Sequence, residues 1–140
     1  MQQFRISEAA GLLGVSDDTV RRYVDQGKLP SRRDASNRAV IDGVALAEFA
    51  RDTAHAAPDP SGVSRSARNR LVGLVTSVTA DRVMAQVEIQ CGPYRVVSLM
   101  STEAATELQL EPGALAVAII KSTNVVVEIP DKSLRRSTSE

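Results

Sequence analysis

Apolar residues in the first part of the chain recur at the spacing of an α-helix. Residues 7–13 predict a first helix with Ser7 as its N-cap, and Gly14 breaks it. Ser16 is placed to cap a second helix, which Gly27 ends. Two helices joined by such a short turn are typical of a helix-turn-helix.

The next residues predict a hairpin and a third helix. Within 27–41, two short extended stretches flank the polar turn 34–37. Asp42 is then placed to cap a helix that contains Val44, Leu46, Phe49 and Ala50.

Beyond residue 64 the pattern changes from helical spacing to short runs rich in Val and Ile. These runs predict five strands, at 71–78, 83–90, 94–100, 115–121 and 124–130. Between the third and fourth, Ala104, Ala105 and Leu108 have helical spacing. Five strands and one short helix favour a small OB-like five-stranded β-barrel. The fold class predicted for the chain is therefore α+β, with helices first and a barrel second.

Composition limits the size of each core and the kind of partner. Hydrophobic residues make up 43% of the 140 residues but aromatic residues only 3%, so each core is small and we expect homo-oligomerisation through the barrel. The net charge is zero, so any DNA binding must depend on a local basic patch. Cys91 is the only cysteine, and the sequence has neither a signal-peptide core nor a membrane-spanning run, which predicts a cytoplasmic protein without membrane contact.

Residues typical of an enzyme are missing from the sequence. The single histidine, His55, has no neighbouring Cys or His with which to share a metal, and no glycine loop could cradle a phosphate. We therefore expect neither catalytic residues nor a metal site.

The segment 13–30, "LGVSDDTVRRYVDQGKLP", with the hairpin and helix that follow it, resembles the winged helix-turn-helix of the MerR-type and excisionase families. The resemblance implies that the second helix enters the major groove of double-stranded DNA and that the wing contacts backbone. Asp17 and Asp18 would repel phosphate or else read a cytosine amino group. The basic side chains could instead be surface charges paired with Asp25 and Asp34. The expected DNA-contacting residues are Thr19, Arg21, Arg22, Lys28, Arg32, Arg33 and Arg38.

Two other segments, "SARN" at 66–69 and "IKSTNV" at 120–125, resemble the molbindins, the molybdate-binding domains of the TOBE class. Backbone N–H groups, hydroxyls and two cations form an all-donor set, which suits a dianion without protons. The resemblance implies molybdate or tungstate as the ligand, held between subunits, with residues 66–68 of one chain meeting residues 121–123 of another. The expected oxyanion-binding residues are Ser66, Ala67, Arg68, Ser101, Lys121, Ser122 and Thr123.

One position departs from the molbindin pattern. Ala104 stands where many molbindins have a second serine, which removes one hydroxyl donor. The alternative is that the two segments only begin and end exposed strands, with no ligand between them.

Together these features divide the chain into a winged helix-turn-helix (1–52), a linker (53–64), an oxyanion-binding TOBE domain (65–130) and a disordered tail (131–140). This domain plan predicts a molybdate-sensing transcriptional regulator, similar in plan to the ModE-type regulators. Two alternatives are a molybdate storage protein and a DNA-binding architectural protein whose barrel only oligomerises.

Overall fold

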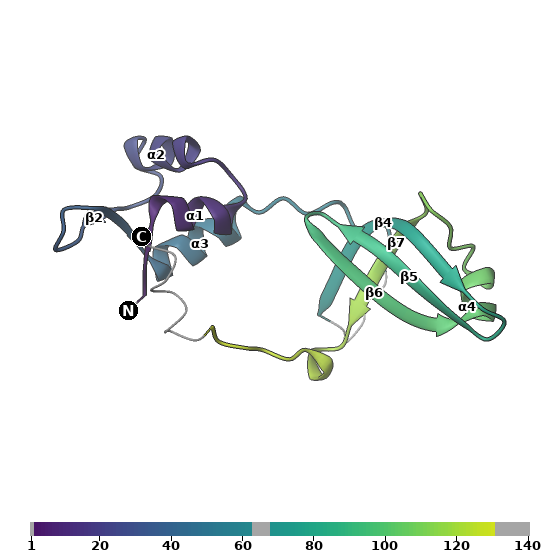
Figure 1. Ribbon diagram of the computed structural model, residues 1–140. Coiled ribbons are helices and arrows are strands. Elements are labelled where there is room, and N and C mark those ends of the chain that lie inside the picture. The colour runs from purple at the N-terminus through teal and green to yellow at the C-terminus, as the bar shows by residue number, and fades with distance from the viewer. Residues whose placement is uncertain (1, 63–67, 131–140) are drawn as a thin grey trace. The chain divides into compact units, whose positions relative to one another are not determined.

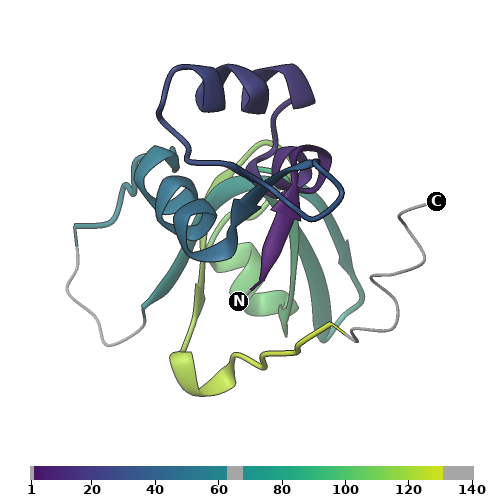
Figure 2. The same cartoon turned by 90° about the vertical axis from the view of Figure 1, so that its left-hand side faces the viewer.

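The computed structural model describes residues 2–62 and 68–130, which divide into two compact units, Met1–His55 and Ala56–Glu140. The first unit contains three helices, α1 (Ile6–Leu13), α2 (Asp17–Asp25) and α3 (Gly43–Thr53). A small antiparallel sheet of β1 (Gln3–Arg5), β2 (Arg32–Arg33) and β3 (Ala39–Asp42) has the order β1-β3-β2. Figure 1 labels the three helices and β2, and Figure 2 turns the side of the unit that carries β2 toward the viewer.

The helices and the hairpin lie where the sequence predicts them, and one core holds them together. Its buried members come from both helices of the pair, from β3, from α3 and from the turn after α2. They are Ala9, Ala10, Val20, Leu29, Ile41 and Leu46. The short β1 is an element that the hydrophobic pattern did not predict.

Two of the predicted helix caps are wrong in detail. Helix α1 begins one residue earlier than expected, and the Glu8 carboxylate, not Ser7, accepts the free N–H of the N-cap residue Arg5 at 2.9 Å. Asp42 stands at the N-cap of α3, but its carboxylate makes no capping bond and instead pairs with Arg32 at 2.8 Å. Ser16 does cap α2, because its hydroxyl accepts the N–H of Thr19 at 3.2 Å.

The second unit is built on a curled antiparallel sheet. Its strands are β4 (Asn69–Ala80), β5 (Met84–Cys91), β6 (Tyr94–Ser101) and β7 (Leu115–Ile120), in the order β6-β5-β4-β7. The long β4 pairs with β7 along its first half and with β5 along its second, and it changes partner at Leu74. Helix α4 (Thr102–Glu107) connects β6 to β7, and Ala105 is its buried residue.

The core of this unit is small and aliphatic. Val75, Val87, Ile89 and Cys91 are buried, and burial raises the pKa of the Cys91 thiol. The thiol lies against Gly73 on β4, where an added Cβ would be only 2.7 Å from the sulfur. The absence of a side chain at Gly73 therefore permits the close approach of β4 and β5.

The expected fifth strand at 124–130 is wrong. After β7 the chain forms a short 3₁₀ turn, η1 (Ser122–Asn124), and then continues to Pro130 as an exposed segment without strand pairing. The described part of the unit therefore has four strands and forms an open half-barrel, because β6 and β7 do not pair with each other.

The expected linker has no regular secondary structure between Ala54 and Gly62, but it is partly fixed. Asp59 makes a two-bond ion pair with Arg70 on β4, with the closest N–O distance 2.5 Å, and Ser61 bonds the same guanidinium. The Arg70 hydrogen bonds hold the pKa of Asp59 well below its usual range. In the described residues, no helix has the length and apolar character needed to cross a membrane.

Candidate functional site

A groove of about 560 Å³ in the first unit lies between the start of α1, helix α2 and the β2–β3 turn. Four guanidinium-bearing residues line it: Arg5 at the end of β1, Arg21 on α2, and Arg33 and Arg38 on the two sides of the turn. Ser7, Ser31 and Asn37 add polar groups to the same wall. Such a set of donors suits the phosphates and base edges of a nucleic acid.

Hydrogen bonds within the turn hold two of these arginines. Arg33 donates to the Asn37 carbonyl at 3.1 Å, and Arg38 pairs with the Asp34 carboxylate at 3.2 Å. Asp34 also accepts the backbone N–H groups of Ser36 and Arg38, both at 2.9 Å. The bond from the Arg38 N–H contributes most to lowering the pKa of Asp34, so this carboxylate stays charged and keeps the turn closed.

Acidic residues also reach the groove. Asp17 and Asp25 line it, and Arg21 is paired with Asp18 at 3.0 Å. The Arg21 pair is exposed on both sides, so it contributes little and leaves the guanidinium available to a ligand. The two carboxylates of the groove lower its attraction for phosphate, as the sequence suggested for Asp17.

The other predicted DNA-contacting residues do not line this groove. Arg32 points to the opposite face of β2 from Arg33, toward Asp42. Thr19 and Arg22 bond each other on α2 at 3.4 Å. Lys28 lies at a separate apolar hollow. Arg5 is the groove residue that sequence reasoning missed, because the strand that places it has too few residues to give a pattern.

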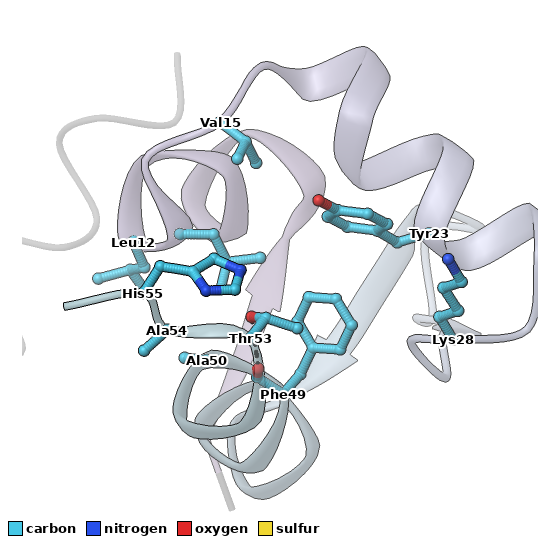
Figure 3. A pocket seen from close by; sticks show the side chains of 10 residues that line it. Leu12, Val15, Tyr23, Lys28, Phe49, Ala50, Thr53, Ala54 and His55 are labelled. Atoms are coloured by element: carbon cyan, nitrogen blue, oxygen red, sulfur yellow. Dashed lines mark hydrogen bonds between the residues drawn. The ribbon is translucent and has the colours of Figure 1, made fainter. Parts of the chain in front are cut away.

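That hollow, of about 630 Å³, lies between α1, α2 and the end of α3 (Figure 3). Tyr23 and Phe49 form a tilted aromatic pair there, with ring centroids 5.0 Å apart. His55, expected in the linker, belongs to this unit and lines the hollow beside Leu12. No group of three or more His, Cys, Asp or Glu able to hold a metal occurs in the part of the chain that the structure describes.

In the second unit, the described part of the first predicted oxyanion-binding segment, residues 68–69, meets the second at one end of the sheet. Asn69 on β4 is paired with Ile120 on β7, and its side-chain amide donates to the Ile120 carbonyl at 3.1 Å. Arg68 and Lys121, the adjacent residues, are therefore neighbours at this edge, and both are exposed. This pairing lies within one chain, and the expectation that residues 66–68 of one chain meet residues 121–123 of another stays a prediction.

The remaining predicted ligands are distributed differently. Ser122 and Thr123 lie in η1, directly after Lys121, and are exposed. Ser66 and Ala67 lie outside the described residues.

Ser101 lies at the far end of the sheet. It pairs with Met84 at the start of β5, which is near the end of β4, so a path of roughly 36 Å along β4 separates it from Asn69. Its hydroxyl caps α4 by accepting the Ala104 N–H at 3.1 Å. The hydroxyl proton remains available to donate to a ligand.

Comparison with known proteins assigns both units. Residues 65–127 match the TOBE domain, and residues 5–41 match the MerR family regulatory proteins. A Haemophilus influenzae protein described as "Probable molybdenum-pterin-binding protein" is 46% identical over 65 residues, which are 46% of this chain and 94% of the relative. The chain belongs to the molybdenum-pterin-binding protein family. Its TOBE domain carries this relationship, and a MerR-type unit precedes it.

Two further relatives share the TOBE domain. The molybdenum transport protein ModE of Herbaspirillum seropedicae is 38% identical over 63 residues, which are 44% of this chain and only 23% of ModE. The solved structure of the cytoplasmic molybdate-binding protein ModG, with molybdate bound, has 40% sequence identity, a TM-score of 0.48, and coverage of 51% of this chain and 52% of ModG.

Proposed function

We propose that this protein is a molybdate-responsive regulator, which binds double-stranded DNA through a winged helix-turn-helix and molybdate, or tungstate, through its TOBE domain. A single observation carries the proposal: a MerR-family match and a TOBE match occupy separate parts of one chain. The printed functions of its TOBE relatives concern molybdenum or molybdate, which supports the choice of ligand. The protein acts by binding, not by catalysis.

The arginine-lined groove supports the DNA-binding half of the proposal. Arg21 lies on the helix that would enter the major groove, and Arg33 and Arg38 lie on the turn that would contact phosphates. The carboxylates of Asp17 and Asp25 limit the affinity of a single copy. Paired half-sites bound by two copies raise the affinity again.

The sheet edge with Arg68 and Lys121 supports the oxyanion-binding half. Both cations are exposed beside a pairing that fixes the backbone on either side. Ser122 and Thr123 add hydroxyls and backbone N–H groups, so the set contains donors for the four oxygens of molybdate. Ser101 lies at the other end of the sheet from this edge, so we infer that a site that includes it takes Ser101 from a second copy.

Calorimetric titration with molybdate, tungstate and sulfate tests the ligand. We expect molybdate binding in the wild type and at least a tenfold loss in the Arg68→Ala, Lys121→Ala double variant, since each charge-assisted hydrogen bond contributes about 1.5–3 kcal/mol. Arg51→Ala, an exposed cation on α3 of the first unit, is the matched control and should bind normally. Unchanged molybdate binding in the double variant would show that the site is elsewhere.

One observation favours molybdate storage as a second candidate function. The H. influenzae relative is almost entirely TOBE domain, because this domain covers 94% of it, so the domain exists without a MerR-type unit. Fluorescence anisotropy with upstream DNA fragments separates the two functions. A regulator shows a preferred sequence whose affinity changes with molybdate, whereas a storage protein shows neither.

A further inference from the structure

The end of the sheet beside Arg68 and Lys121 carries a third cation, Arg70. Arg70 pairs with Ile119 on β7, so it lies two residues along β4 from Arg68, and Ile119 lies two residues along β7 from Lys121. Side chains alternate between the two faces of an extended chain, which places the three cations on one face. Two residues of strand span about 7 Å, a distance that an arginine side chain can bridge.

Residues 59–61, which we call the strap, occupy the guanidinium of Arg70. The Asp59 carboxylate accepts from its Nε at 2.5 Å and from its Nη2 at 3.3 Å. The Ser61 hydroxyl oxygen accepts from the same Nη2. The strap thus offers Arg70 one carboxylate and one hydroxyl oxygen, a set of acceptors similar to that of an oxyanion.

The strap does not satisfy the whole guanidinium. Within the part of the chain that the structure describes, Nη1 of Arg70 is buried and has no hydrogen-bond partner. A buried donor without an acceptor destabilises the pair that leaves it in this state. The Asp59 side chain is 33% exposed, so it can leave Arg70 for water without opening the core.

The charge of Asp59 makes the strap a competitor of any anion bound to the neighbouring cations. The hydrogen bond from Arg70 holds the pKa of Asp59 well below its usual range, so the carboxylate is charged at neutral pH. A negative charge on this face repels a dianion that approaches Arg68 and Lys121. An anion that displaces Asp59 removes this repulsion and gains the donors of Arg70.

We propose that Arg70 is a third cation of the oxyanion site and that a bound anion takes it from Asp59, which frees the strap. This inference rests on the proposed binding of molybdate beside Arg68 and Lys121. It adds that Asp59 lowers the affinity of the site. Occupation of the site then changes the segment that leads to the first unit.

Calorimetry of a charge-removing variant tests the competition. Asp59→Asn keeps the shape of the side chain and should tighten molybdate binding about tenfold, because the competing charge is lost. Glu88→Gln is the matched control, since it removes the carboxylate of another ion pair of the same unit, with Arg95. Glu88 pairs with Ser77, eight residues along β4 from Asn69, or roughly 27 Å of strand, so its affinity should not change. Unchanged affinity in Asp59→Asn overturns the proposal.

A double-mutant cycle with Arg70→Gln separates competition for Arg70 from simple repulsion of the anion. We expect Arg70→Gln to weaken molybdate binding at least about tenfold in the Asp59→Asn background, because the third cation is lost. In the Arg70→Gln background, Asp59→Asn should change the affinity by no more than about twofold. A full effect of Asp59→Asn without Arg70 would show that the carboxylate acts only by its charge, which contradicts the exchange.

A tryptophan reporter detects release of the strap directly. The sequence contains no Trp, and a Cβ added at Gly62, next to the strap, has no atom within 4 Å. We expect molybdate to lower the fluorescence anisotropy of Gly62→Trp, and Asp59→Asn to lower it without molybdate. Unchanged anisotropy while molybdate binds overturns the proposal.

The same measurements distinguish failure of this inference from failure of the proposed function. Normal molybdate binding by the wild type, with no gain in Asp59→Asn, overturns only the exchange at Arg70. Absence of molybdate binding in the wild type and in every variant overturns both.

Discussion

Gly73 lies at the closest approach of two strands in the TOBE domain. A Cβ at this position would be 2.3 Å from the Gln90 carbonyl oxygen and 2.7 Å from the Cys91 sulfur. Backbone cannot move aside as the end of a side chain can, so we expect Gly73→Ala to lower the free energy of unfolding by about 1–3 kcal/mol. Urea denaturation measures the change. Gly62→Ala, with no atom within 4 Å of the added Cβ, should be nearly neutral.

Asp34 makes the stability of the MerR-type unit depend on pH. Its pKa is lowered from 3.8 in the folded chain, so its contribution is fully present above that value and is lost as the pH falls through the lower, folded pKa. We expect Asp34→Ala to destabilise the unit at pH 7 and to cost progressively less below pH 3.8.

Asp34→Asn is the matched control, because an amide oxygen still accepts the Ser36 and Arg38 N–H groups but does not titrate. Denaturation of the full chain in a Tyr94→Phe background, followed by the fluorescence of Tyr23, gives the comparison at each pH. A cost of Asp34→Ala that is the same at pH 3 and pH 7 would contradict this role.

At the scale of the element, helix α2 directs the side chains of two consecutive arginines to different surroundings. Arg21 lines the groove, whereas Arg22 bonds Thr19 away from it. We expect Arg21→Ala to lower affinity for a preferred DNA sequence by about 1–3 kcal/mol and Arg22→Ala to have a much smaller effect. Anisotropy with the preferred and a scrambled duplex measures both. Equal losses for the two variants would mean that α2 does not present the face that lines the groove.

The sequence predicted those helices and strands whose formation depends on residues close to them in the chain. Ser16 and the apolar spacing place α2 correctly, since a cap and a helical face depend on neighbours within four residues. The strand β1 was missed because Gln3–Arg5 gains its order from pairing with β3. Residues 124–130 have a clear strand pattern, yet a strand also needs a partner edge, and the chain turns away from one at η1.

The sequence predicted which residues form the candidate oxyanion site but not where each of them lies in the fold. The motifs identified Arg68 and Lys121, and the register between Asn69 and Ile120 brings them together. The distance of Ser101 from this edge depends on the length and pairing of β4, which no motif encodes.

For the whole molecule, the ion pair of Asp59 with Arg70 shortens the connection between the two units. Only residues 54–58 lie between the end of α3 and this anchored point. Five residues span at most about 18 Å when fully extended. A structural change in the TOBE domain would therefore reach the first unit through a short connection. We expect a flexible Gly/Ser insertion after Ala57 to leave molybdate affinity unchanged and to weaken the effect of molybdate on DNA binding.

The matched control is the same insertion after Gly62. That position lies inside the loop closed by the ion pair, so the insertion lengthens the loop but not the connection. Parallel calorimetry and anisotropy follow the two affinities. If both insertions uncouple the sites equally, the ion pair does not set the effective length of the connection.

The change of partner along β4 has a consequence for the order in which the TOBE domain assembles. Strands β4, β5 and β6 follow one another through short turns, whereas Asn69 and Ile120 are 51 residues apart. Loop closure makes distant pairings late, so the three-strand meander should form first and β7 should dock last. Amide hydrogen exchange should then be faster in β7 than in β5. The end of the sheet beside Arg68 and Lys121 should thus be the last part to fold and the first to open, and an anion bound there would stabilise it against opening.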